Sequence, residues 1–464
     1  MNITFNNNDN ICAISSPNGT GGVSIIRISG KDAIEITQNL FSKNIKNAKG
    51  YSVHYGSIFE NKNEIDEVIL TIFRSPNSFT GEDTTEINCH GSTFIQQKII
   101  ELLIQNGARI ARAGEFSQRA FLNGKMDLSQ TEAIADLIHA NSSAAHKIAI
   151  NQMKGGFSNE LKQLREQLVE FASLVELELD FAEEDVEFAD RNQLNNLLNK
   201  LEKHINGLKS SFKYGNAIKN GVPVAIAGKP NSGKSSLLNT LLNEQKAIVS
   251  DIPGTTRDAI EDVVIVDGIK YRFIDTAGLR KTKDIIESKG IEITKSKISE
   301  ASILLYLFDI SDTNEEEIIN DLKEFNRQDL KIILIRNKVD LKNNSEIDLE
   351  KLLKKSSEFG IKEIIEISAL DKKSVEMLIN KLSKIYQLIQ RSSDTVITNM
   401  RHYESLSQAL ISLCEVEKGL ENDISGDLLS IDLRKAIDSI GEITGQITND
   451  ELLGNIFSNF CIGK

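Results

Sequence analysis

Three patterns of hydrophobic and polar residues follow one another along the chain. Residues 1–120 carry short β-type runs at 22–28, 68–73 and 85–89, separated by Gly, Asn and Pro turns. One helical run at 93–105 lies among them, and Gly107 is expected to end that helix. The pattern predicts a small α+β domain.

The spacing of apolar residues becomes helical from about Leu128. Ser129 and Glu132 have the spacing of a capping box and are predicted to begin a helix. The next helix has one apolar face, formed by residues that recur every three or four positions: Leu161, Leu164, Leu168, Phe171, Val175 and Leu179.

Helical spacing returns after about Lys372, and Asp450 is predicted to begin the last helix. The apolar stripe of this block consists of Leu406, Leu410, Leu413 and Leu420. Each helical block alone would leave its stripe in water, so we expect the two blocks to pack together. Two separate bundles are the alternative.

Between the helical blocks, residues 216–368 alternate between strands, loops and helices. Strands are predicted at 222–227, 271–274, 303–308 and 332–335, which indicates a parallel α/β domain. We therefore predict an N-terminal domain at 1–120, a helical domain formed by 121–215 and 380–464, and an α/β domain at 216–379 inserted into it.

Composition narrows the class of protein. The chain has 464 residues and a formal net charge of −13, which excludes nonspecific attraction to nucleic acid over the whole surface but leaves a local basic patch open. The longest apolar run, 303–308, is far shorter than the ~20 residues that span a bilayer, and residues 1–10 lack a signal pattern. The cysteines form no CxxC pair, so a disulfide framework or zinc site is not indicated. We expect a cytoplasmic protein without a membrane segment.

The segment Gly228-Lys-Pro-Asn-Ser-Gly-Lys234-Ser235 matches GxxxxGK[ST] between a predicted strand and a predicted helix. Glycine lets backbone N–H groups wrap phosphates, and the helix N-terminus adds partial positive charge. Lys234 would neutralise the β- and γ-phosphate oxygens, and the Ser235 hydroxyl would bind Mg²⁺. The alternative is a Gly-rich turn that contains Lys and Ser by chance and binds no phosphate. The motif alone leaves ATP and GTP open.

Base selection is predicted from Asn337-Lys338-Val-Asp340, which follows the strand at 332–335. The Asp340 carboxylate can accept two hydrogen bonds from the N1–H and N2–H₂ edge of guanine, a donor pair that adenine cannot present. Ser368-Ala-Leu370 is expected to contact the base from the last loop. In this position after a phosphate loop, the tetrapeptide favours GTP.

Two further segments complete the predicted nucleotide-binding motifs: Gly254-Thr-Thr256-Arg-Asp258 and Asp275-Thr-Ala-Gly278. Asp275 would reach Mg²⁺ through water. Thr256 would add a second hydroxyl to the metal when the γ-phosphate is present, which makes its loop the expected switch.

Leu279 stands where Ras-like GTPases have a glutamine that orients water. Hydrolysis therefore needs another group, and Asp284 and Glu287 are the nearest acidic candidates, with solvated loop carboxylates as the alternative. The GTP-binding residues are predicted to be Asn231, Ser232, Gly233, Lys234, Ser235, Ser236, Ser250, Asp251, Ile252, Pro253, Gly254, Thr255, Thr256, Asp275, Thr276, Ala277, Gly278, Asn337, Lys338, Asp340, Ser368, Ala369 and Leu370.

Motifs outside the phosphate loop are more specific to one family. They are Asp251-Ile-Pro-Gly-Thr-Thr-Arg-Asp, Asn77-Ser-Phe-Thr-Gly-Glu82-Asp, Gly114-Glu-Phe-Ser-Gln-Arg-Ala-Phe-Leu-Asn-Gly-Lys125 and the terminal Phe460-Cys461-Ile-Gly-Lys464. With them the chain resembles, over essentially its whole length, the tRNA uridine-modifying GTPases of the MnmE (TrmE) family.

The resemblance implies a potassium site beside the phosphates. Asn231, with backbone groups at Ser250, Ile252 and Thr255, would hold K⁺ when two GTPase domains dimerise, and the cation would do the work of an arginine finger. A loop amide that hydrogen-bonds its own turn is the alternative for Asn231. By the same resemblance Glu287 matches the water-orienting glutamate and is preferred.

The N-terminal domain resembles the family's folate-binding and dimerisation module. It implies Arg27, Glu82, Lys125 and Lys464 as ligands of a formyl- or methylene-tetrahydrofolate. Arg or Lys would suit the acidic glutamyl tail, and a carboxylate would suit the donor edge of the pterin. Without the resemblance, the sequence would predict each of these four residues to be a surface residue that forms an ion pair.

Cys461 lies near the C-terminus, where a thiol can be exposed and chemically used. The resemblance places it facing the modification site, as a candidate catalytic residue. The alternative is a hydrophobic plug beside Phe457 and Phe460.

The resemblance as a whole implies a homodimeric, potassium-dependent GTPase. It would work in a heterotetramer or larger assembly with a partner of the MnmG/GidA family that carries FAD, and would modify C5 of the wobble uridine, position 34, of certain tRNAs. Lys147, Lys154, Lys162 and Arg165 are candidate RNA contacts, with a solvated helix face as the alternative. Other readings are a GTPase scaffold, for instance in ribosome assembly, and an ATP-driven enzyme.

Overall fold

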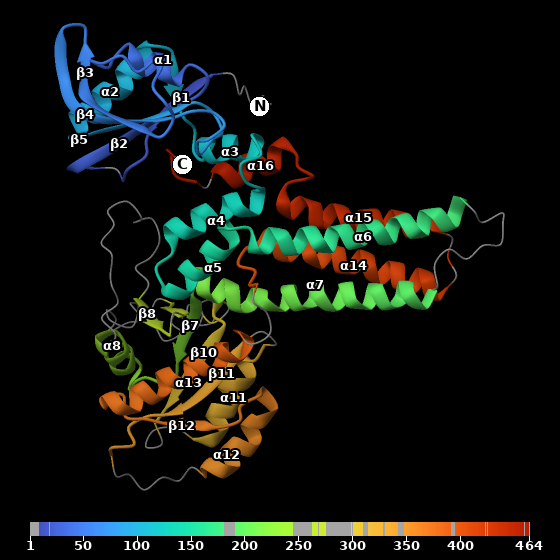
Figure 1. Ribbon diagram of the computed structural model, residues 1–464. Coiled ribbons are helices and arrows are strands. Elements are labelled where there is room, and N and C mark those ends of the chain that lie inside the picture. Colours follow the sequence, from blue (N-terminus) through green and yellow to red (C-terminus); the bar gives the residue numbers. More distant parts are fainter. Residues whose placement is uncertain are drawn as a thin grey trace. The chain divides into compact units, whose positions relative to one another are not determined.

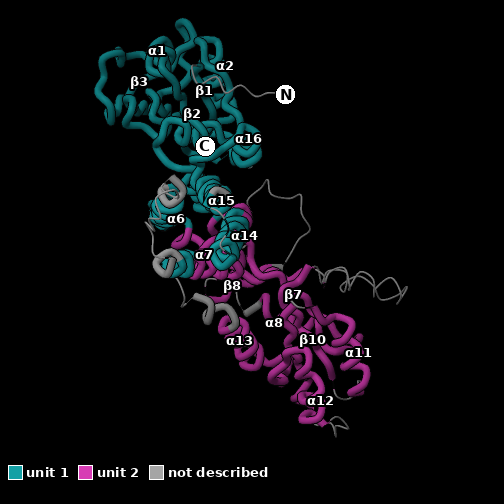
Figure 2. The backbone as a smooth tube through the Cα atoms, turned by 90° about the vertical axis from the view of Figure 1, so that its right-hand side faces the viewer, with its two compact units in different colours: residues 1–139, 149–201, 405–464 teal, residues 140–148, 202–404 magenta. Residues whose placement is uncertain are grey.

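The protein is described from a computed structural model, which divides into two compact units (Figure 2). The first unit comprises residues 1–139, 149–201 and 405–464, and the second comprises 140–148 and 202–404. The structure describes residues 9–17, 19–180, 191–244, 262–267, 269–274, 298, 300–309, 314–327, 330–341, 348–390, 395–422, 424, 426–458 and 460–463. Within these ranges, no helix has the length and apolarity needed to cross a membrane.

The first unit contains a six-stranded sheet in the order β3-β4-β5-β2-β1-β6 (Figure 1). The pair β1 and β6 is parallel, and the other neighbours are antiparallel. The strands are β1 (Asn10–Ile14), β2 (Gly21–Ser29), β3 (Ser52–Glu60), β4 (Asn63–Phe73), β5 (Thr84–Gly91) and β6 (Ala108–Ile110). The predicted runs fall in β2, β4 and β5, so the α+β prediction is confirmed, while β1, β3 and β6 were not predicted.

Two helices share a hydrophobic core with this sheet: α1 (Ala33–Gln38) and α2 (Thr93–Gln105). The predicted helix at 93–105 is α2, and Gly107 follows its C-cap in the left-handed conformation (φ +104°) that glycine adopts readily. The single-helix prediction was wrong, because α1 and α3 (Glu115–Leu122) are too short to show helical periodicity.

The remaining helices of the first unit come from both sides of the α/β segment. They are α4 (Leu128–His139), α6 (Gly156–Asp180), α15 (Gly426–Thr444) and α16 (Asp450–Ser458). Helices α6 and α15 lie side by side (Figure 1), and α6 buries its predicted apolar positions from Leu161 to Val175. The expected packing of the two helical blocks is thereby confirmed. Three helices contribute residues to both units: α5 (Ser143–Met153), α7 (Arg191–Asn220) and α14 (Met400–Glu421).

The prediction that Ser129 caps α4 was wrong. The side chain of Asp127 accepts a hydrogen bond from the backbone N–H of Gln130 at 2.8 Å, and Ser129 donates its hydroxyl to the same carboxylate at 2.9 Å. A carboxylate one residue before the helix satisfies the free N–H of Gln130, so Ser129 lies inside the first turn. The last helix, α16, begins at Asp450 as predicted.

The second unit contains a sheet in the order β12-β11-β10-β7-β9-β8. The neighbours from β12 to β9 are parallel, and β8 is antiparallel to β9 at the edge, so the parallel-sheet prediction holds except for β8. The strands are β7 (Val222–Ala227), β8 (Asp262–Val266), β9 (Ile269–Phe273), β10 (Ile303–Phe308), β11 (Lys331–Arg336) and β12 (Ile364–Glu366).

Hydrophobic cores lie on both faces of this sheet. Alternate residues of β10 serve the two cores: Leu305 and Leu307 join one, and Leu304 and Tyr306 join the other. The first core contains α8 (Lys234–Glu244) and α13 (Lys372–Gln390), and the second contains α11 (Glu315–Phe325) and α12 (Leu349–Ser356). This is a doubly covered α/β fold, whose ligands bind at the carboxyl ends of the strands.

Candidate nucleotide-binding site

The segment that matches the phosphate-loop motif connects the end of β7 to the start of α8. A Cβ at Gly228 would lie 2.0 Å from the carbonyl oxygen of Leu307, and one at Gly233 would lie 2.0 Å from Nδ2 of Asn337. Both residues also have positive φ. The loop therefore approaches the ends of β10 and β11 as closely as only glycine permits, as expected for the motif, whose backbone wraps phosphates.

Lys234 is the first residue of α8, and its side chain folds over the loop that precedes it. Its ammonium group donates hydrogen bonds to the carbonyl oxygens of Gly228 at 2.7 Å and Lys229 at 2.6 Å. Burial lowers the pKa of Lys234 to about 8, because the charged form loses water. A phosphate group placed here would favour the charged form, so the residues fit the nucleotide that the motif implies.

Asn337 joins three segments of the site. Its Nδ2 donates to the carbonyl oxygen of Ser232 at 2.7 Å, and its Oδ1 accepts from the backbone N–H of Ala369 at 2.9 Å. Thr240, from α8, donates its hydroxyl to the carbonyl oxygen of Ala369 at 2.7 Å. The phosphate loop, the end of β11 and the loop after β12 are thus brought together as the motif order requires.

The segment predicted to select the base lies at the same edge. Asn337 and Ser368 are buried, Asp340 is exposed, and Leu370 is 78% exposed. Lys338 adopts positive φ and forms an ion pair with Asp309, with Nζ 2.7 Å from Oδ2. Asp309 was not predicted, although an aspartate directly after the apolar strand at 303–308 was a usable signal.

A second unpredicted contact reaches the phosphate loop from α11. Lys229 pairs with Glu317, whose carboxylate also completes a capping box with Asn314 at the start of that helix. The first turn of α11 is thereby tied to the second residue of the loop. Several predicted residues lie outside the described part of the chain: Ser250, Asp251, Ile252, Pro253, Gly254, Thr255, Thr256, Asp275, Thr276, Ala277, Gly278, Asp284, Glu287 and Lys464.

In the first unit, the predicted ligand Arg27 belongs to β2, and the predicted ligand Glu82 contacts Ser29, the last residue of that strand. Arg27 pairs with Glu86 at 2.8 Å and lies over the rings of Phe79 and Phe116, with distances of 5.5 and 5.6 Å to the centroids. Glu82 accepts a hydrogen bond from Ser29 at 2.7 Å.

Glu82 also belongs to a cluster of ion pairs that joins distant parts of the first unit. Arg119, whose side chain is 2% exposed, pairs with Glu82 at 3.1 Å, with Asp9 and with Glu115. Arg109 pairs with Asp9 at 2.6 Å and with Glu115. Burial alone would raise the pKa values of Asp9 and Glu115, but hydrogen bonds from the guanidinium groups outweigh it and lower both.

Lys125 and the C-terminal residues lie close to the same domain. The Lys125 ammonium donates to the carbonyl oxygen of Pro76 at 2.9 Å. Ile462 forms an antiparallel bridge with Ala113, and Ser15 donates its hydroxyl to the carbonyl oxygen of Gly463 at 3.1 Å. Ile462 and Gly463 are therefore hydrogen-bonded to the segments that directly follow β1 and β6 of the N-terminal sheet.

Cys461 is exposed, while Phe457 and Phe460 beside it are buried. The aromatic rings, rather than the thiol, close the end of α16 against Leu128. The plug alternative therefore describes the two phenylalanines and not the cysteine.

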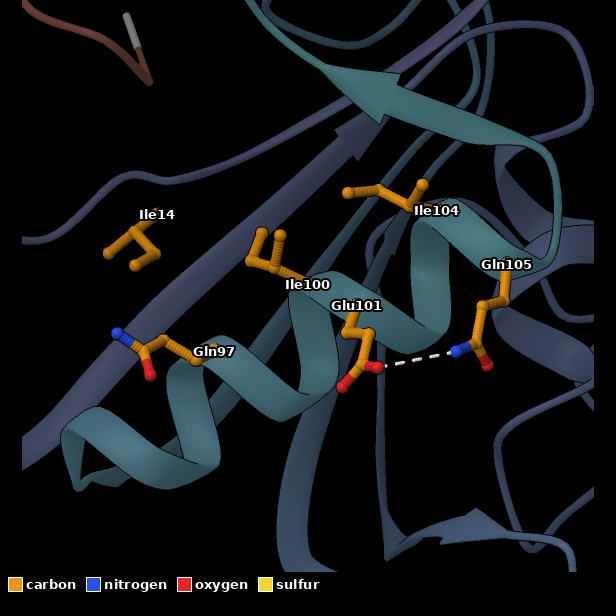
Figure 3. Close-up of a pocket in the computed structure, with 6 residues that line it drawn as sticks. All are labelled: Ile14, Gln97, Ile100, Glu101, Ile104 and Gln105. Atoms are coloured by element: carbon orange, nitrogen blue, oxygen red, sulfur yellow. Dashed lines mark hydrogen bonds between the residues drawn. The ribbon is translucent and has the colours of Figure 1, made fainter.

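An apolar groove of about 310 Å³ runs along α2 (Figure 3). Ile14, Ile100 and Ile104 line it together with Gln97, Glu101 and Gln105, and the last two are joined by a hydrogen bond of 3.4 Å. No titratable cluster suited to catalysis accompanies the apolar side chains that line it, so the groove has the character of a contact surface.

The second unit combines a glycine-built loop of the phosphate-binding motif, Lys234 folded over that loop, and the motif predicted to select guanine, and together they define the class of P-loop GTPases. Comparisons with known proteins then identify the family. The model described as MnmE helical domain matches residues 128–461, and the model described as GTP-binding protein TrmE N-terminus matches residues 10–125.

Similar proteins span nearly the whole chain. Three of them, each named tRNA modification GTPase MnmE, come from Flavobacterium johnsoniae (51% identical, 99% of this chain and 100% of the relative), Cytophaga hutchinsonii (50%, 99% and 98%) and Bacteroides thetaiotaomicron (50%, 99% and 100%). The chain belongs to the MnmE (TrmE) family and is a GTPase.

Proposed function

We propose that the chain hydrolyses GTP as part of a complex that modifies C5 of the wobble uridine, position 34, of certain tRNAs. The observation that carries this proposal is the assembled phosphate loop and Asn337 segment in a chain about 50% identical to tRNA modification GTPases over almost its full length. A flavin-dependent partner of the MnmG/GidA family would supply FAD, and a formyl- or methylene-tetrahydrofolate would supply the carbon.

For GTP hydrolysis, Lys234 would neutralise the phosphates, and Ser235 and Thr256 would bind Mg²⁺. Asn231, with backbone groups at Ser250, Ile252 and Thr255, would hold K⁺. The support is that Asn231 is exposed, so its side chain is not buried in the hydrophobic core. Its backbone is in the left-handed conformation, with φ 61°. Glu287 would orient the attacking water.

For the one-carbon step, Arg27, Glu82, Lys125 and Lys464 would bind the folate. The support is that Glu82 and Arg27 are held on one side of the N-terminal sheet by Ser29 and by Phe79 and Phe116. Arg27 would face the acidic tail and Glu82 the pterin edge. Exposed Cys461, on a chain end tied to the same sheet, would act at the modification site.

The chain would act as a homodimer through its N-terminal sheet and α2. The apolar groove along α2 supports this, as do the exposed apolar residues of β3 and its start: Tyr51 at 70%, Val53 at 65% and Tyr55 at 57%. Exposed apolar surface of this kind marks interaction sites. The exposed residues Lys147, Lys154 and Lys162, with partly exposed Arg165, remain proposed contacts for tRNA.

The potassium proposal is tested by steady-state GTP hydrolysis in KCl and NaCl at equal ionic strength. The wild type should be at least about tenfold faster in KCl, as expected when a cation stabilises charge on the transferred phosphoryl group, and Asn231→Ala should lose the difference. Asn326→Ala, an exposed amide at the end of α11, is the matched control. Equal rates in both salts would refute the potassium site.

The tRNA proposal is tested by reconstitution with the flavin-dependent partner, tRNA, folate and GTP, followed by mass spectrometry of nucleoside 34. Modified uridine is expected with the wild type and none with Lys234→Ala. Intact GTP hydrolysis without modified uridine would favour a GTPase scaffold.

A further inference from the structure

The ion pair between Asp309 and Lys338 lies at the carboxyl ends of β10 and β11, where the segment predicted to select the base begins. Asp309 directly follows β10, and its side chain is 7% exposed, while that of Lys338 is 33% exposed. The two charged atoms are 2.7 Å apart. A carboxylate this well buried is costly unless a positive group compensates it, and Lys338 supplies that charge.

The backbone fixes both partners of this pair. Strands β10 and β11 are parallel with Phe308 opposite Arg336, and the N–H of Asn337 donates to the carbonyl oxygen of Phe308 at 2.9 Å. Lys338 follows in the left-handed conformation, φ +61°, which only a few percent of residues other than glycine adopt. The side chain of Lys338 is thus held at both ends: its backbone is constrained, and its ammonium group pairs with a buried carboxylate.

We propose that Asp309 is a positioning residue for guanine-nucleotide binding, which acts by holding the side chain of Lys338 in place. A free lysine has many rotamers, and ordering it on binding would weaken affinity. Because the pair with Asp309 already orders Lys338 in the nucleotide-free chain, that entropy loss occurs on folding and not on binding. The proposal concerns nucleotide affinity and does not depend on the tRNA reaction.

A second ion pair of the same sheet offers a comparison. Arg336 and Glu366 pair at 2.7 Å across β11 and β12, but Glu366 is 50% exposed and neither residue belongs to a nucleotide motif. Breaking this pair removes an ion pair from the neighbouring strands without touching Lys338. Glu366→Gln is therefore the matched control for Asp309→Asn.

The test is the dissociation rate of a fluorescent GDP analogue from the full chain, measured for Asp309→Asn, Lys338→Met and the double variant. Asp309→Asn should release the nucleotide about tenfold faster, the size of effect expected when a charge-assisted contact that orders a ligand-binding side chain is lost. In the Lys338→Met background the same substitution should change the rate by less than about twofold, because its target is gone. Glu366→Gln should also stay within about twofold of the wild type.

Acetylation of Lys338 in the nucleotide-free chain gives an independent readout. Its reaction with acetic anhydride, followed by mass spectrometry, should be several-fold faster in Asp309→Asn than in Glu366→Gln, because a released amine is more accessible. Unchanged acetylation, or an equal effect of Asp309→Asn in both lysine backgrounds, would overturn the proposal and leave Asp309 a purely structural residue. If Asp309→Asn is too unstable to purify, Asp309→Glu, which keeps the charge and moves it, is carried through the same measurements.

Discussion

The side-chain amide of Asn337 donates a hydrogen bond to the carbonyl oxygen of Ser232 at 2.7 Å, so the end of β11 is fastened to the phosphate loop. The same side chain accepts from the N–H of Ala369. A single buried amide therefore sets the spacing between the parts of the site that are predicted to bind phosphate and those predicted to face the base.

Replacing Asn337 by alanine should lower the free energy of unfolding of the second unit by about 2 kcal/mol, from two buried hydrogen bonds of about 1 kcal/mol each. Urea unfolding without nucleotide measures it, and GDP identifies the transition because binding raises its midpoint. Asn326→Ala, at an exposed position of the same unit at the end of α11, should change stability by less than about 0.5 kcal/mol. An equal loss in both variants would contradict the bridging role of Asn337.

Nucleotide binding should take up protons above pH 8. The pKa of Lys234 is about 8 in the free chain, so the side chain is mostly neutral at pH 8.5, and phosphate would restore its charge. Calorimetry of GDP binding in buffers of different ionisation enthalpy should give an uptake of roughly 0.7 proton at pH 8.5 and little at pH 6.5. Lys234→Arg stays charged throughout, so uptake of the same size in that variant would refute the assignment.

The same lowered pKa has a consequence for stability. Burying charged Lys234 costs free energy below pH 8, and the cost is relieved as the pH rises from 8 toward 10.5, because the unfolded chain then binds more protons than the folded one. The stability of the wild type relative to Lys234→Met should therefore increase over this range, as measured by thermal unfolding.

Arg119→Met should destabilise the first unit by about 3–5 kcal/mol, because it leaves the largely buried Glu82 without a charged partner and removes one of the two guanidinium groups that pair with Asp9 and Glu115. Since the pKa values of Asp9 and Glu115 are lowered, their contribution is present above about pH 4.5 and is lost as the pH falls further. The loss caused by the substitution should thus be smaller in urea unfolding at pH 3.5 than at pH 7. Arg434→Met, which breaks the exposed pair with Glu176, should cost less than about 1 kcal/mol.

Alkylation at pH 8 should separate the cysteines into two classes. Burial raises the pKa values of Cys12 and Cys89 to about 11, so these thiols are both inaccessible and protonated. Cys414 and Cys461 are exposed and should react with iodoacetamide. Peptide mass spectrometry should find only the last two labelled before denaturation and all four afterwards. Early labelling of Cys12 would show that the N-terminal sheet opens.

The sequence was sufficient for the elements whose signal is local. The strand at 303–308 and the helix at 93–105 have strong periodicity, and the phosphate loop is contiguous, so their positions followed from residue order. Edge and short elements were missed, because β6 and α1 are stabilised by contacts with strands and helices far along the chain. Ser129 was wrongly predicted as the cap because the helix begins earlier, at Leu128, where the side chain of Asp127 accepts the hydrogen bond from the N–H of Gln130.

The ion pairs of Asp309 and Arg119 were not predicted for the same reason. Asp309 acts on a residue of the next strand, and Arg119 gathers carboxylates from residues 9, 82 and 115. Pairing of this kind is set by sheet order and by the docking of α3, which no spacing rule along one segment reveals. The family resemblance pointed to Glu82 as a site residue, but it did not show that Arg119 is the arginine that pairs with it.

The order of synthesis gives the bridge between Ala113 and Ile462 a further meaning. Residues 405–464 complete the first unit, yet they leave the ribosome after residues 202–404 of the second unit, which emerge as one stretch. The second unit can therefore begin to fold before residues 405–464 are synthesised, while the first unit cannot be completed until they emerge. A nascent chain halted before α15 would already hold nucleotide but would lack the helix that packs against α6.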